Sequence, residues 1–195
     1  MKIQTCFALI KMNNRARGFS LVESLVTMTM LVMLIAMAIP SYLSFTIDTR
    51  MTAGANDFLT MLSFTRSEAV KRNTRVTLCK SSSGTACTTS GDWQQGWIVF
   101  VDAPTPDIGK VDGADTILRV QGALTGASTL VGTANVANYI SYVSNGQSQL
   151  GNGAMQGGTL YLCSPDATAA GRHIELSSGT GRARIERDDA PATCS

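Results

Sequence analysis

The sequence contains few of the residue types from which enzyme active sites are built. His173 is the only histidine among 195 residues, and no serine or cysteine near it completes a recognisable nucleophile motif. The chain also lacks the phosphate-binding pattern G-x-x-x-x-G-K-[ST] and a dinucleotide-binding loop. These absences argue against the common hydrolases and nucleotide-dependent enzymes, and we expect no enzymatic activity.

Metal-binding patterns are missing as well. The cysteines do not have C-x-x-C spacing, which with a single histidine argues against a zinc site. An acidic stretch does not match the ligand spacing of an EF-hand loop; its aspartates are Asp102, Asp107, Asp112 and Asp115. We therefore expect no metal ion and no cofactor, and we interpret the acidic stretch as a solvated loop.

The composition favours a domain rich in strands and loops. Charged residues make up only 15% of the chain, and 18 residues are glycine. Such a composition suits a β-rich, extracytoplasmic domain better than a helical bundle.

The longest apolar segment runs from Phe19 to Ile39, and Glu23 is its only charged residue. At ~1.5 Å per residue, a helix of this length crosses a hydrocarbon core of roughly 30 Å. Basic residues just before it favour a cytoplasmic N-terminus; they are Lys11, Arg15 and Arg17. A carboxylate within such a segment costs about 2.5 to 3.5 kcal/mol on insertion scales, so Glu23 is expected to have a function.

No small-x-small cleavage site follows Ile39, so the segment is not an ordinary secretory signal. The junction Gly18-Phe19, with Glu23 and Pro40 in register after it, resembles the class III signal of type IV pilins and type II secretion pseudopilins. This resemblance implies cleavage after Gly18 by a prepilin peptidase, N-methylation of Phe19 and retention of the helix as an assembly stem. A plain single-span anchor is the alternative, but it leaves Glu23 unexplained.

On this interpretation residues 1–18 are a leader peptide. A start at Met12 also gives a complete short basic leader, and Cys6 would then never be made. The net charge of +2 includes four basic residues of the leader, so the mature chain is expected to be slightly acidic. Net charge therefore gives no argument for a nucleic-acid partner, and any such site must be a local patch.

The periodicity after the apolar segment predicts more helix and then a series of strands. Pro40 is expected to kink the helix, which then continues to about Lys71 or Asn73. We thus expect a helix over 19–73, with its transmembrane part over 19–39, and a β-rich head over 74–195. Strands are predicted at Val76–Lys80, Trp97–Val101, Ile117–Gln121, Tyr139–Val143, Thr159–Cys163, Ile174–Leu176 and Ala183–Glu186. Residues 97–101 alternate poorly, so this strand should be buried on both faces.

Nearly the whole mature chain resembles the FimT, FimU and GspH family of minor pilins and minor pseudopilins. The matching stretches are TRSEAVKRN (65–73), VTLC (76–79), GWIVFVD (96–102), ILR (117–119), LYLC (160–163) and GRAR (181–184). The resemblance implies an α+β type IV pilin fold, with a long N-terminal stem helix and a β-sandwich-like head. It also implies a subunit that is inserted in the bacterial inner membrane with its head in the periplasm. The subunit then assembles with other major and minor pilins into a pilus at the cell surface.

Four cysteines remain after the leader: Cys79, Cys87, Cys163 and Cys194. An even number in an exported domain favours disulfides. Of the three possible connectivities we favour Cys79 with Cys87, across a short polar insert, and Cys163 with Cys194, which ties the C-terminal tail to an internal strand.

The C-terminal region contains the candidate binding site. Arg182 and Arg184 alternate with Ala183, so a strand projects both guanidinium groups from one face, and Gly181 allows close backbone approach. The Gly-Arg-x-Arg tail resembles the DNA-binding element of FimT-type minor pilins used in natural transformation. This resemblance implies that Arg182 and Arg184 clamp phosphates, in a patch extended by Arg172, Arg187, Lys71, Arg72 and Arg75.

Two alternatives to DNA binding stay open. FimU-like and pseudopilin relatives also end in a Gly-Arg turn, and neighbouring carboxylates would neutralise the arginines; these are Glu186, Asp188 and Asp189. The chain is then an assembly-priming minor pilin without DNA binding, or a GspH-like minor pseudopilin of the type II secretion system.

Overall fold

The computed structural model describes residues 18–103, 107–113, 115–126, 128–164 and 171–188. The chain divides into two compact units, residues 1–41 and 42–195, and each is described by itself. Helix α1 (Leu21–Arg72) contributes to both units. The second unit is referred to below as the head.

In the first unit, the helical residues expose their apolar side chains. Leu31 is 55% exposed, for example, and Phe19, just before the helix, is also exposed. The helix continues through Pro40 without a break, because a proline removes one backbone hydrogen bond while its neighbours persist; the kink expected there stays a prediction. Within the described residues, no helix has both the length and the apolarity that a membrane span requires. The span predicted over 19–39 stays a prediction.

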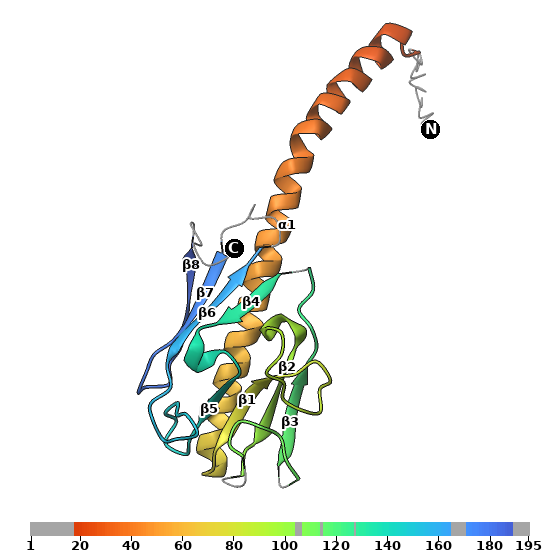
Figure 1. Cartoon of the computed structure of the whole chain (residues 1–195). Coiled ribbons are helices and arrows are strands. Elements are labelled where there is room, and N and C mark those ends of the chain that lie inside the picture. Colours follow the sequence, from red (N-terminus) through yellow and green to blue (C-terminus); the bar gives the residue numbers. More distant parts are fainter. Residues whose placement is uncertain (1–17, 104–106, 114, 127, 165–170, 189–195) are drawn as a thin grey trace, which may run out of the picture. The chain divides into compact units, whose positions relative to one another are not determined.

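Among the described residues, the head contains two antiparallel sheets of four strands, both of which Figure 1 shows. The first has the order β3-β2-β1-β5, with β1 (Val76–Lys80), β2 (Trp97–Val101), β3 (Thr116–Gln121) and β5 (Tyr139–Tyr142). The second has the order β4-β6-β7-β8, with β4 (Thr129–Gly132), β6 (Gly158–Cys163), β7 (Gly171–Leu176) and β8 (Ala183–Asp188). Short 3-10 helices at Trp93–Gln95 and Ala134–Val136 lie between strands.

The second half of α1 packs its apolar face into the core of the head. Phe58 is fully buried and makes edge-to-face contacts with Trp93 and Trp97, with ring centroids 5.2 and 5.1 Å apart. The same cluster includes Leu62 of the helix, Leu78 of the first sheet and Leu160, Leu162 and Ile174 of the second. One face of the helix therefore packs against both sheets.

Most predicted strands agree with the structure to within a few residues. Strands β1 and β2 have the predicted bounds, and β2 is buried over nearly its whole length, as expected. Strand β4 was not predicted, because only Leu130 of its four residues is buried and a short run with one buried position gives little periodic signal.

Cys79 and Cys87 form the disulfide that the sequence favours, with Cα atoms 5.6 Å apart. Cys163 is also disulfide-bonded. Its favoured partner, Cys194, lies outside the described residues, so that pairing stays a prediction.

The interpretation of the acidic stretch as a solvated loop is wrong for Asp102, which is fully buried at the end of β2. Its Oδ2 accepts hydrogen bonds from the Thr77 hydroxyl at 2.5 Å and from the Gly109 amide at 2.9 Å. Burial raises the pKa of the Asp102 carboxyl above its usual value, and these two hydrogen bonds oppose the shift. The carboxylate is buried because the loop folds back over it and supplies a backbone donor.

Candidate functional site

The hairpin of β7 and β8 carries Arg184, one of the two arginines at the centre of the predicted patch. Strand pairing places Glu175 opposite Arg184, and the Arg184 guanidinium donates two hydrogen bonds to Glu175 Oε2, at 2.6 and 2.9 Å. Glu186 adds a second carboxylate at 3.0 Å. The hydrogen bonds to Glu175 raise the pKa of Arg184 above its ordinary value. Its charge is therefore largely compensated within the hairpin.

Arg172 is not part of an exposed patch, contrary to the prediction. It is only 7% exposed, and its guanidinium donates to Asp48 Oδ1 at 2.7 Å and to the Thr52 hydroxyl at 3.2 Å. Both partners lie on α1, so Arg172 connects β7 to the helix. This role is structural, because a buried guanidinium with fixed partners cannot reach a ligand in solvent.

The basic residues near the end of α1 also have partners of their own. Lys71 and Arg72 both pair with Glu68, at 3.4 and 2.8 Å. The Arg75 guanidinium donates to the Ser141 hydroxyl at 2.6 Å and to the Gln149 carbonyl at 3.1 Å. None of the three lines the hollows beside β8. Arg187 is exposed on β8, opposite Arg172 in the strand register.

Arg182 differs from the other arginines of the predicted patch. Its side chain is exposed, and among the described residues it makes no hydrogen bond and no ion pair. It lines two hollows. One hollow, of about 530 Å³, is also lined by Arg184 and Glu175. The other, of about 200 Å³, is also lined by Arg66 and Tyr142.

At Gly181 the absence of a side chain allows another part of this chain, rather than a ligand, to come close. It has φ +63°, and an added Cβ would lie 2.8 Å from the Gly146 carbonyl oxygen and 2.9 Å from the Tyr142 ring. A residue with a side chain would be disfavoured here for two reasons: the positive φ and the close contacts of its Cβ. Gly181 therefore lets the β7–β8 turn pack against the turn after β5.

Two family models match the sequence. The model described as type II transport protein GspH covers residues 54–180, and the prokaryotic N-terminal methylation motif covers residues 13–39. The chain belongs to the GspH family. It is therefore a minor pilin or pseudopilin of a type IV pilus or a type II secretion system. Its methylation motif implies processing by a prepilin peptidase and a membrane-anchored form before assembly.

Solved structures of other minor pilins and pseudopilins resemble this chain. The minor pilin FimU of Pseudomonas aeruginosa PAO1 is 19% identical, with a TM-score of 0.51, covering 74% of this chain and 92% of FimU. The minor pseudopilin EpsH of the Vibrio cholerae type 2 secretion system is 14% identical, with a TM-score of 0.46, covering 71% of this chain and 97% of EpsH. No protein with a curated description matches significantly. The likeness to FimU shows the type IV pilin fold, a helix followed by an antiparallel head.

At the N-terminal end of this GspH-family chain, the predicted processing residues lie in the open. An added Cβ at Gly18 would meet nothing within 4 Å, and Phe19 is exposed. Glu23 is exposed in the first turn of α1, where a carboxylate interacts favourably with the helix dipole. The roles of Gly18 and Phe19 in processing, and of Glu23 in assembly, stay predictions.

Arg66 is the residue of the candidate site that the sequence did not single out. It lies on α1, within the stretch 65–73 that carries the family resemblance, and only the fold brings it beside Arg182. No local pattern relates two residues so far apart in the chain.

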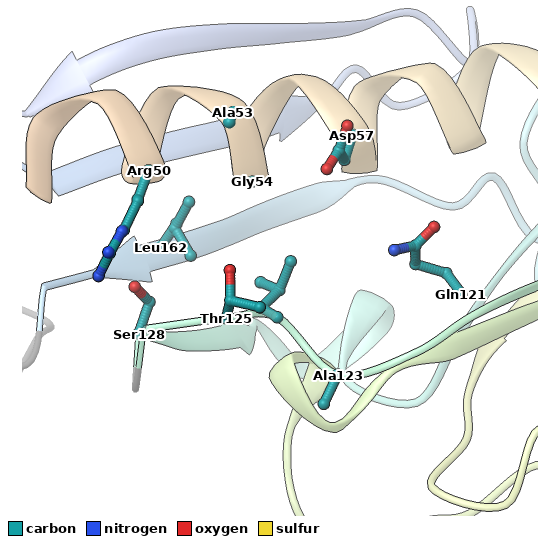
Figure 2. A pocket seen from close by; sticks show the side chains of 10 residues that line it. Arg50, Ala53, Gly54, Asp57, Gln121, Ala123, Thr125, Ser128 and Leu162 are labelled. Atoms are coloured by element: carbon teal, nitrogen blue, oxygen red, sulfur yellow. The ribbon is translucent and has the colours of Figure 1, made fainter. Parts of the chain in front are cut away.

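A further hollow, of about 250 Å³, lies between α1 and the segment before β4 (Figure 2). Arg50 and Asp57 border it from the helix, and Leu162 of β6 also lines it. A single arginine and a single carboxylate on an open surface do not define a binding chemistry.

Proposed function

We propose that this chain is a minor pilin of a type IV pilus, held there by the first half of α1. One observation carries the proposal: the apolar side chains of residues 19–37 are exposed in the isolated chain, whereas most of those of residues 51–69 are buried by the head. Exposed apolar surface on this scale indicates an interaction surface. Neighbouring pilin helices supply the cover in the assembled pilus.

Glu23 is expected to act in this assembly step. A carboxylate among apolar helices is costly unless it is paired, and the terminal amine of a processed Phe19, in this or a neighbouring subunit, is a suitable partner. The pairing requires that cleavage after Gly18 has created the amine.

The test uses an epitope-tagged full-length chain in its own cell. We expect the tag in the sheared pilus fraction, with an N-methylated Phe19 terminus by mass spectrometry, and Glu23→Ala should reach the membrane but fail to enter pili. Asp57→Ala, which removes an exposed carboxylate from the part of α1 that lies in the head, is the matched control and should assemble normally. A chain that is absent from pili but required for secretion of a type II substrate would instead identify a pseudopilin.

DNA binding is a second candidate, and Arg182 is the observation that favours it. Phosphate contacts come from arginines free to form bidentate hydrogen bonds, and the Arg182 guanidinium has no partner among the described residues. The patch is smaller than the sequence indicated, because Arg184 is ion-paired and Arg172 is buried. Binding is therefore expected to be weak, sequence-independent and salt-sensitive.

Fluorescence anisotropy of a labelled DNA duplex, with the full chain in a mild nonionic detergent, tests this candidate. Replacing Arg182 by glutamine should lower the affinity and reduce the salt slope by about one, since one phosphate contact is lost. Arg184→Gln should have the smaller effect, because its charge is already compensated. Equal affinities of wild type and Arg182→Gln would remove DNA from this account while leaving the assembly role intact.

A further inference from the structure

Two arginines from distant parts of the chain meet at a hollow of about 200 Å³ in the head. Arg66 comes from α1 and Arg182 from the turn before β8. The remaining lining residues are Leu62, Ser63, Tyr142, Gly181 and Ala183. No carboxylate is among them, so the two positive charges are not compensated by the walls.

Neither arginine is engaged elsewhere. Among the described residues, the side chains of Arg66 and Arg182 make no hydrogen bond and no ion pair. Arg66 is half-buried, and its guanidinium passes over the turn after β5, where an added Cβ on Gly146 would lie 3.2 Å from Arg66 Nε. A half-buried guanidinium without a partner has lost part of its hydration without compensation, which favours an anion beside it.

Tyr142 provides an independent observation. It is only 1% exposed, it lines the hollow, and no described residue hydrogen-bonds to its hydroxyl. Burial raises the pKa of Tyr142 far above its ordinary value, although the nearby Arg66 lowers it in part, so the phenol keeps its proton. The hydroxyl itself stays accessible although most of the side chain is buried, so it can donate a hydrogen bond to a ligand in the hollow.

The geometry points to a binding site for a phosphate group, held by the Arg66 and Arg182 guanidinium groups and the Tyr142 hydroxyl. Phosphate fits these donors better than a carboxylate does, because it offers three or four acceptor oxygens to two forked guanidinium groups and a hydroxyl. Its higher charge also matches two arginines. This site goes beyond the assembly role and does not depend on DNA being the source of the phosphate.

The local fold keeps the hollow open and narrow. Gly181 and Gly146 both have positive φ, +63° and +77°, and allow the two turns to meet without side chains between them. The site therefore depends on tertiary contacts among α1, the turn after β5 and the β7–β8 turn. No single segment of the chain forms the site alone.

The first experiment follows the thermal unfolding midpoint of the full chain in detergent as sodium phosphate replaces sodium chloride at constant ionic strength. A ligand that binds only the folded state raises the midpoint with a dose dependence that gives its affinity. Arg66→Gln and Arg182→Gln should each weaken the apparent affinity by about tenfold or more, and Tyr142→Phe by several-fold. Arg50→Gln, which changes another exposed arginine of the same helix (Figure 2), should leave the affinity unchanged.

A second variant guards against loss of folding. Ser63→Asp places a carboxylate at the exposed rim without removing a core contact, and it should abolish the response to phosphate while the midpoint in chloride stays close to wild type. A phosphate response that survives in Ser63→Asp and in both arginine variants, or no response in the wild type, overturns the site.

The source of the phosphate is tested with the DNA duplex. If Arg66→Gln weakens DNA binding as Arg182→Gln does, the site takes a backbone phosphate. If only the response to inorganic phosphate is lost, it takes a free phosphate or a phosphate monoester. Loss of DNA binding in Arg182→Gln alone, with phosphate binding intact in all variants, would leave the DNA candidate and exclude this site.

Discussion

The first half of α1 and the head differ in the solvent exposure of the same kinds of apolar residue. Leu31 is 55% exposed, whereas Leu62, on the same helix, is 1% exposed beneath the two sheets. Helical periodicity cannot explain this difference, because both residues belong to one continuous helix. The comparison indicates that the head depends on contacts within the chain and that residues 19–37 depend on contacts with other molecules.

The most direct test of this comparison substitutes the two leucines. Leu62→Ala should lower the free energy of unfolding of the head by about 2 to 5 kcal/mol, because it leaves a cavity in the core. Leu31→Ala should change it by less than ~0.5 kcal/mol, as exposed substitutions usually do. Urea unfolding of the full chain in detergent, followed by tryptophan fluorescence, reports on the head because Trp93 and Trp97 are buried there. Equal losses in both variants would contradict the comparison.

A smaller effect is expected at the polar contact between β7 and the helix. Arg172→Gln should lower the free energy of unfolding by about 1 to 3 kcal/mol. The substitution breaks hydrogen bonds to the Asp48 carboxylate and the Thr52 hydroxyl in a nearly buried position. The matched control is Arg184→Gln, whose ion pairs are exposed and should be worth only about 0.2 to 1 kcal/mol. The same urea titration measures both. A larger loss from Arg184→Gln would show that Arg172 does not anchor the helix.

The smallest effect concerns pH and the buried Asp102. Because the pKa of Asp102 is raised on folding, its contribution to stability is fully present below the unfolded pKa, near ~3.9, and is lost as pH rises through the folded value. Asparagine mimics the protonated form and does not titrate. Asp102→Asn should therefore gain stability relative to wild type as pH rises from about 4 to 7.

Urea titrations at several pH values in this range measure that difference, and Asp107→Asn, at an exposed position of the same loop, is the control. A difference between Asp102→Asn and wild type that stays constant with pH would mean that Asp102 has the same pKa in both states. The exposed half of α1 should contribute nothing to this dependence.

Local patterns predicted much of the fold for a physical reason. The apolar steps of three and four that place Phe58 and Leu62 on one helix face are local in the sequence, and so are the β-branched runs of β1 and β2. The Cys79–Cys87 disulfide could be predicted because it closes a short loop. Strand β4 escaped prediction because its partner, β6, lies far along the chain and only Leu130 is buried.

The sequence by itself determined the N-terminal methylation motif, the long helix, most strands and the presence of arginines near the C-terminus. Only the tertiary structure decided which arginines are available. Arg172 is buried against the helix, Arg184 is paired across the hairpin, and Arg182 is brought beside Arg66. A charge in the sequence says nothing about its partners, because ion pairs and hollows depend on residues that meet only when the chain folds.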